Sequence, residues 1–156
     1  MFHAAAILLC LVGQAPAAPA ASPLAFDVDK LKAMPQVELK VNDSGRETTY
    51  RGVPLAAVLP GAGGTKRSMA ELRSYSGSAI LIRAEDDYRT TVSASAVAMD
   101  PDGRRYLLAS ARDGVPLDAA EGPFKLIVPD DPQHVRWIRN IKSIHLIRLD
   151  RIELGP

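Results

Sequence analysis

Basic residues are concentrated near the C-terminal end of the chain, where they alternate with apolar residues around its single tryptophan. The stretch reads Gln133-His-Val-Arg-Trp-Ile-Arg-Asn-Ile-Lys-Ser-Ile-His145. An arginine binds a phosphate or carboxylate through two parallel hydrogen bonds, so Arg136 and Arg139 are candidate anion-binding residues, with His134 as a third. The alternative is that they are solvated cations at a strand edge, where charge also prevents edge-to-edge pairing. We expect an anion site at His134, Arg136 and Arg139, with Trp137 in the core.

Three other polar stretches could carry chemistry, and we assign each of them to a turn or loop. The adjacent carboxylates of Glu85 and Asp86 could bind a metal or act as an acid–base pair, but a solvated turn is the commoner role. The turn Asp100-Pro-Asp-Gly103 lacks the further acidic ligands of a calcium loop. Gly61-Ala-Gly-Gly-Thr-Lys66 does not have the spacing of a phosphate-binding loop. The sequence thus predicts no catalytic residue and no metal site.

Composition excludes several classes of function. The chain has 156 residues and a net charge of +1, so we expect neither nucleic acid nor an anionic membrane surface as a partner. An apolar run followed by Ala18-Pro19-Ala20 predicts a signal peptide over residues 1–20. The protein is then periplasmic or secreted, with no membrane attachment after cleavage. Its only cysteine, Cys10, leaves with the signal, which excludes disulfides and thiolate metal sites.

Residues 21–35 read as a leading segment or linker, residues 36–150 as one domain and residues 151–156 as a tail. Alternating or continuous apolar patterns bounded by turn residues predict strands, and Ser93 and a capping box at Ser68 and Glu71 predict short helices. Strands are expected at 36–41, 46–51, 79–84 (buried on both faces), 89–92, 105–110, 124–128 and 143–149. Helices are expected at 52–59, from Ser68 to about Tyr75, and at 94–99, with a short turn or helix within 26–35. The sum is an α+β fold with a curled, mostly antiparallel or mixed β-sheet.

The order of these segments resembles a known family. Tyr50-Arg-Gly-Val-Pro-Leu follows a strand, and Asp113-Gly-Val-Pro-Leu, Glu121-Gly-Pro-Phe-Lys-Leu-Ile-Val-Pro and Val135-Arg-Trp-Ile come later. From about Gln36 to Arg148 the chain resembles the molybdopterin-binding domain of the sulfite-oxidase family, in the short form found in exported bacterial proteins. The resemblance implies molybdopterin as the cofactor and places Arg136, beside Trp137, where the family contacts the pterin phosphate.

The resemblance also implies a cysteine thiolate on the metal, placed just after the strand that precedes Gly-Val-Pro-Leu. That position falls near Val41, whose neighbours Lys40, Asn42 and Asp43 are not thiolates. An amide or carboxylate is a poor substitute for soft sulfur. The sequence therefore favours an accessory module without catalysis, which binds a periplasmic protein or a small anionic ligand in a cleft between Arg136 and the 85–88 turn.

Two alternatives remain open at this point. The first is a molybdopterin-dependent oxidoreductase whose cofactor is held without a protein thiolate. The second is a purely structural periplasmic domain with no small ligand.

Overall fold

The computed structural model describes residues 21–61 and 67–149, and within them nine strands, three short α-helices and one 3-10 helix. The predicted signal peptide, most of the Gly61–Lys66 stretch and the predicted tail lie outside the described residues. The elements, in chain order, are β1 Ala21–Pro23, α1 Val28–Ala33, β2 Val37–Asp43, β3 Arg46–Pro54, η1 Leu55–Val58, α2 Met69–Ser74, β4 Ser78–Ala84, β5 Arg89–Ser93, α3 Ala94–Ala98, β6 Leu107–Arg112, β7 Val115–Pro116, β8 Lys125–Ile127 and β9 Ile141–Arg148.

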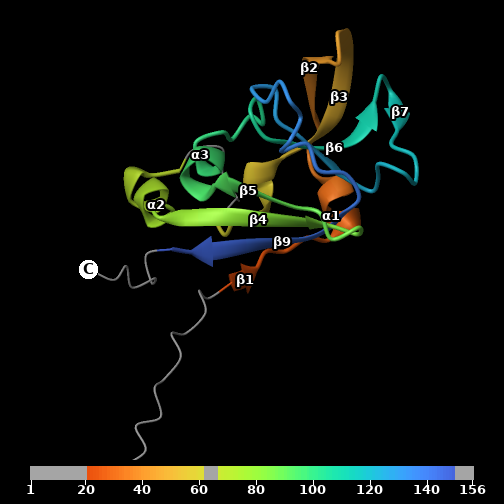
Figure 1. Cartoon of the computed structure of the whole chain (residues 1–156). Helices are drawn as coiled ribbons and strands as arrows, with labels where there is room; N and C mark the ends of the chain where they lie inside the picture. The colour runs from red at the N-terminus through yellow and green to blue at the C-terminus, as the bar shows by residue number, and fades with distance from the viewer. Residues whose placement is uncertain (1–20, 62–66, 150–156) are drawn as a thin grey trace, which may run out of the picture.

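The strands form two sheets, and every described pairing is antiparallel. One sheet has the order β1-β9-β4-β5, and the other has the order β2-β3-β6-β7 with β8 also paired to β6. In Figure 1 the first sheet runs along the lower part of the molecule, and the β2–β3 hairpin stands away from it. The α+β fold is confirmed, and the expected single sheet is divided into two.

The β2–β3 hairpin forms where it was expected because its turn chemistry is local. Asn42 accepts a hydrogen bond from the Gly45 amide at 2.7 Å, and Ser44 and Gly45 both have positive φ. Glycine adopts the left-handed region without strain, and an asparagine side chain readily accepts a bond from a nearby backbone amide in a turn. The pairing continues without a break from Asp43 opposite Arg46 to Val37 opposite Gly52.

The expected helix over residues 52–59 is wrong. Strand β3 runs on to Pro54, and only η1 follows. Two features keep the chain extended: the residue before a proline is driven out of the α region, and Gly52 packs against β6. A Cβ at Gly52 would lie 1.9 Å from the Leu108 carbonyl oxygen, so only glycine permits this approach of the strands.

Strand β4 was expected to be buried on both faces, and this is also wrong. Its burial alternates, with Ile80 and Ile82 fully buried and Leu81 between them only half-buried. One face of the sheet packs on the core and the other is partly open, as antiparallel sheets commonly are. The core lies between the two sheets and includes Tyr50, Phe124 and Trp137, so the prediction that Trp137 is a core residue is confirmed.

The helix caps agree with the sequence. The hydroxyl of Ser68 accepts from the Glu71 amide at 3.2 Å, and the Glu71 carboxylate accepts from the Ser68 amide at 2.7 Å, which is the predicted capping box. Ser93 accepts from the Ala96 amide at the start of α3. These reciprocal bonds satisfy amides that a helix start leaves unpaired.

Residues 21–35 are part of the folded body. Strand β1 pairs with β9, and Leu31 on α1 is buried in the core. Asp27 caps α1 by accepting from the Asp29 and Lys30 amides, both at 3.1 Å. None of the described helices has the length and apolar character needed to cross a bilayer.

Candidate functional site

A pocket of about 310 Å³ lies where the β4–β5 turn, the start of β8 and the loop before β9 meet. We call it the Arg139 pocket. Its lining residues are Ala84, Asp86, Tyr88, Glu121, Lys125, His134, Trp137, Ile138 and Arg139. Two of the predicted site residues, His134 and Arg139, are among them, as are two residues of the 85–88 turn. The volume is at the lower end for a small-molecule pocket, which suits a compact ligand.

The aromatic wall of the pocket is a stack of His134 on Trp137. The ring centroids are 3.9 Å apart and the planes differ by 13°. Tyr50 meets the other side of Trp137 edge-on, with centroids 5.9 Å apart. Trp137 also donates from Nε1 to the Val128 carbonyl at 2.7 Å, and such a bond satisfies the indole N–H of a buried tryptophan. The indole is therefore held from three sides.

Asp131 folds the loop that carries these residues. Its buried carboxylate accepts from the Arg136 backbone amide at 2.6 Å and from Arg136 Nε at 3.3 Å. The His134 amide donates to the Asp131 carbonyl at 3.0 Å, and His134 has a φ of 53°. Arg136 is thus bound to its own loop and is absent from the residues that line the pocket. Its guanidinium holds the loop in shape, whatever else it contacts.

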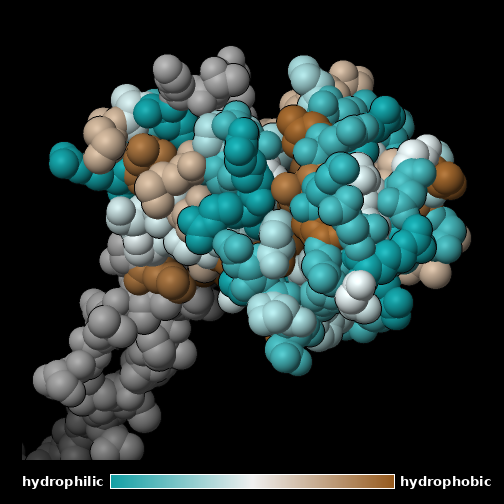
Figure 2. Space-filling model, turned by 90° about the horizontal axis from the view of Figure 1, so that it is seen from above, coloured by the Kyte–Doolittle hydropathy of each residue, from teal (hydrophilic) through white to brown (hydrophobic). Residues whose placement is uncertain are grey.

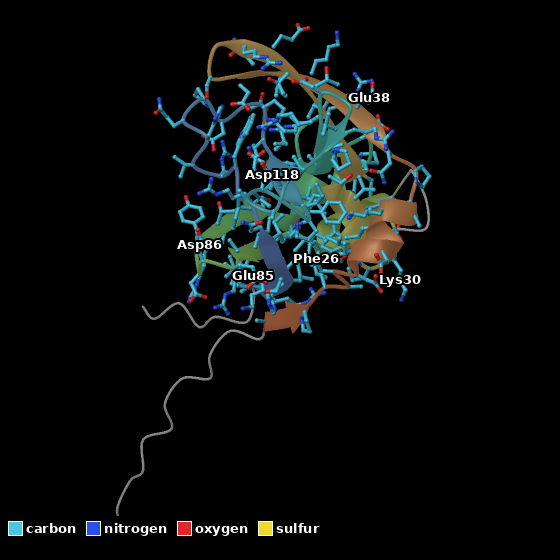
Figure 3. All side chains as sticks on the ribbon, turned by 90° about the vertical axis from the view of Figure 1, so that its right-hand side faces the viewer. Phe26, Lys30, Glu38, Glu85, Asp86 and Asp118 are labelled. Carbon is cyan, nitrogen blue, oxygen red and sulfur yellow. The ribbon has the colours of Figure 1, made fainter. Side chains whose placement is uncertain are left out.

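Arg139 is the exposed cation of the pocket. No ion pair or side-chain hydrogen bond of Arg139 occurs within residues 21–61 and 67–149. The pocket mouth is shaped by Tyr88, whose hydroxyl donates to the Val135 carbonyl at 2.7 Å. Asp86 accepts from the Tyr88 amide at 3.0 Å, which fixes the turn. Figure 3 shows Asp86 and Glu85 together at one side of the molecule.

A half-buried charged network forms part of the pocket wall, and the sequence did not reveal it. Lys125 Nζ is 2.6 Å from Glu121 Oε1, and their side chains are only 12% and 15% exposed. Lys125 Nζ also lies over the rings of Tyr50 and Trp137, at 5.6 and 5.7 Å from their centroids. Glu121 Oε2 is 3.0 Å from Arg112 Nη1, an ion pair without hydrogen-bond geometry. The one signal in the sequence is a lysine inside the apolar run 124–128.

The network continues to the end of β2. The Tyr50 hydroxyl donates to Asp43 at 2.7 Å, and His134 Nδ1 lies 3.8 Å from the other Asp43 oxygen. Burial alone would raise the pKa of the Asp43 carboxyl, but the hydroxyls of Tyr50 and Ser44 bond to it and hold the pKa below its ordinary value. Burial, together with the bond to Asp43, raises the pKa of the Tyr50 phenol. At neutral pH the pair is a phenol donating to a carboxylate.

The arrangement offers charge and aromatic surface, but no metal-binding set. No group of three or more His, Cys, Asp or Glu side chains in the described part of the chain could hold a metal ion. Val41, near which the family resemblance placed a cysteine, is buried in the hydrophobic core. Glu85 pairs with Lys142 at 3.2 Å in a solvent-exposed ion pair. His145 is half-buried, and its Nε2 lies 3.1 Å from the Ser143 hydroxyl.

Comparison with known proteins supports the resemblance noted in the sequence. No curated protein matches the chain significantly. Residues 42–151 match the oxidoreductase molybdopterin binding domain family. The match spans most of the chain, from the end of β2 to beyond β9, and includes every residue that lines the Arg139 pocket. The chain therefore belongs to the oxidoreductase molybdopterin binding domain family.

Proposed function

We propose that this protein is an exported accessory module of the family, which binds a small anionic ligand in the Arg139 pocket and has no molybdenum centre of its own. The observation that carries the proposal is the position of Arg139, an exposed cation without a protein partner in the described chain, at a pocket walled by His134 and Trp137. Export is proposed from the composition of residues 1–20.

The donor atoms around the pocket do not fit a molybdenum-bearing pterin. The pocket lining contains no sulfur, and the only cysteine of the sequence, Cys10, lies in the predicted signal peptide. The pocket volume of about 310 Å³ is too small to enclose a cofactor of this size. We therefore derive no reaction through this group.

Within the pocket, the Arg139 guanidinium is the group that favours a small anion. Lys125 is neutralised by Glu121 at 2.6 Å, so it adds little net attraction. Arg139 has no such partner, and a guanidinium in a partly enclosed site binds an oxyanion more strongly than one in open water. His134 can donate one further hydrogen bond from its ring. A ligand with two or three oxygens on one atom, such as phosphate or sulfite, suits this set.

Tryptophan fluorescence tests the proposal directly, because Trp137 is the only tryptophan and lines the pocket. The purified protein is titrated with orthophosphate and with sulfite. We expect saturable quenching that Arg139→Gln weakens about tenfold, since a hydrogen bond to a charged group contributes roughly 1.5–3 kcal/mol. Arg73→Gln is the matched control, because Arg73 is an exposed cation on α2 that does not line the pocket. Equal affinity of the wild type and Arg139→Gln would sink the proposal.

Family membership favours one alternative, a molybdopterin-dependent oxidoreductase that holds its cofactor without a protein thiolate. Elemental analysis of protein purified from the periplasm distinguishes the two functions. Stoichiometric molybdenum supports the oxidoreductase, and its absence together with anion binding supports the accessory module. The same preparation tests export, because N-terminal sequencing should find a chain that begins near residue 21.

A further inference from the structure

A second pocket, of about 250 Å³, opens between α1, β3 and the loops around β7 and β8. We call it the Arg51 pocket. Its lining residues are Lys32, Gln36, Arg51, Ser110, Ala111, Pro116, Leu117 and Pro123, none of which lines the Arg139 pocket. Figure 3 shows the separation, with Lys30 of α1 and Asp86 of the Arg139 pocket on opposite sides of the molecule. The Arg51 pocket is independent of the function proposed for the Arg139 pocket.

An irregularity in the sheet places Ser110 at this pocket. Arg51 pairs with Ala111 and Gly52 pairs with Ala109, so Ser110 has no partner on β3. Such a bulge re-aims a side chain and is enriched next to functional sites. Gly52 makes the bulge compatible with close strand packing, since any Cβ there would meet the β6 backbone. Ser110 is half-buried, and its hydroxyl makes no side-chain hydrogen bond in the described chain.

Arg51 and Lys32 supply uncompensated positive charge. Neither makes an ion pair within the described residues, although Glu38 is directly opposite Arg51 on β2. Other cations on the same elements are paired: Lys30 lies 3.5 Å from Asp27. On α1 and β3, the two cations without an ion pair in the described chain are the two that line the pocket. An anion between them would relieve their repulsion and gain two charge-assisted hydrogen bonds.

The remaining wall of the pocket is apolar. Pro116, Leu117 and Pro123 line it together with Ala111. Figure 2 shows that hydrophobic groups form small, separate patches on the face of the molecule seen from above. The pocket thus has a polar part, formed by two cations and a hydroxyl, and an apolar part, formed by prolines and a leucine. Such a pocket fits a small amphipathic anion.

We propose that the Arg51 pocket binds a short-chain organic carboxylate. The carboxylate lies between Arg51 and Lys32 and accepts a hydrogen bond from the Ser110 hydroxyl, while a branched apolar body packs against Leu117 and the prolines. The volume of about 250 Å³ limits this body to a few carbon atoms.

Amide chemical shifts test this site with isobutyrate as the probe and isobutyramide as its neutral isostere. In isotope-labelled protein, isobutyrate should shift the amides of Arg51, Ser110, Ala111 and Leu117, and isobutyramide should not. Arg51→Gln and Lys32→Gln should each weaken isobutyrate binding about tenfold. The matched control is Lys30→Gln, on the same helix but outside the pocket, which should bind as the wild type does.

Three outcomes are decisive. If isobutyrate still shifts the Ser110 amide in the Arg139→Gln variant, the Arg51 pocket is a second, independent site. If that shift is lost in the variant, the independence of the site is refuted. Orthophosphate that binds as tightly as isobutyrate overturns the role given to the apolar wall. Equal affinity in the wild type, Arg51→Gln and Lys32→Gln overturns the site as a whole. Heteronuclear spectra of each variant establish that it is folded before any titration is compared.

Discussion

The ion pair of Glu121 and Lys125, whose side chains are 15% and 12% exposed, allows a quantitative test of how the Arg139 pocket is built. Removing one partner of a buried ion pair leaves an uncompensated charge and costs about 3–5 kcal/mol. Glu121→Gln leaves Lys125 with two aromatic rings and the charge of the Asp43 carboxylate in its surroundings. A cation over a ring contributes about 0.5–2 kcal/mol, so we expect Glu121→Gln to lower the free energy of unfolding by about 3 kcal/mol.

The reverse change should cost less. Lys125→Met leaves Glu121 with Arg112 at 3.0 Å, although that arginine is 45% exposed and the contact lacks hydrogen-bond geometry. We expect a loss of about 2 kcal/mol. The double variant Glu121→Gln/Lys125→Met replaces the pair by neutral side chains of similar size and should be within about 1 kcal/mol of the wild type. The two changes then couple by more than about 2 kcal/mol.

Urea unfolding followed by Trp137 fluorescence and by circular dichroism measures these values, provided that the slope with denaturant stays constant. In thermal unfolding, about 3 kcal/mol corresponds to a lowering of Tm by roughly 10 °C for a chain of this size. Glu47→Gln is the control, because Lys40 and Glu47 form an exposed pair at 3.5 Å and such pairs contribute about 0–1 kcal/mol. Additive single changes, or a loss under about 1 kcal/mol for Glu121→Gln, would refute the reasoning.

Three further predictions concern the residues around the site. The pKa of Asp43 is lower in the folded protein than in the unfolded chain, where it is about 4. The ionised carboxylate therefore stabilises the fold above about pH 4, and this stabilisation is lost as the pH falls through the pKa of the folded state. Asp43→Asn should make the free energy of unfolding depend less on pH in the acid range. The pKa of Tyr50 is raised in the folded protein, so its neutral phenol stabilises the fold below about pH 10, and this stabilisation is lost as the pH rises through the folded pKa. An absorbance titration should therefore find that one of the four tyrosines ionises at a higher pH than the others. Asp100 is buried and accepts from the backbone amides of residues 104–106 at 2.9–3.0 Å, so Asp100→Ala should cost at least about 2 kcal/mol and speed hydrogen exchange at those amides.

Each of these predictions has its own contrary result. An unchanged acid limb in Asp43→Asn would show that Asp43 does not stabilise the fold through its pKa. Four tyrosines that ionise together would contradict the buried bond from Tyr50 to Asp43. Unchanged exchange at residues 104–106 in Asp100→Ala would mean that the carboxylate does not hold that turn.

Features that depend on a few neighbouring residues could be predicted from the sequence. The hairpin after Val41 follows from the alternation of β2 and the turn residues Asn42–Gly45. The caps at Ser68 and Ser93 follow from bonds that span three residues. These interactions are local, so they form in the same way whatever the rest of the chain does.

Long-range packing decided the rest. The apolar run over residues 52–59 is compatible with a helix, but pairing of Gly52 with β6 extends β3 through Pro54. The sequence shows Lys125 as an unusual charge within an apolar strand. Only the fold brings it together with its partner Glu121 and its two aromatic neighbours. Pairwise contacts between strands distant in sequence overrode the local preference.

The choice between Arg136 and Arg139 shows the division most clearly. The sequence alone determined that this stretch carries arginines, a histidine and one buried tryptophan, because residue type and spacing suffice for that. Only the tertiary structure decided their roles: Asp131 binds Arg136 into its own loop, whereas Arg139 lines the pocket together with Tyr88 and Trp137. The physical reason is that a side chain's direction in a loop depends on backbone bonds to a buried carboxylate, and no periodicity in the sequence encodes those bonds.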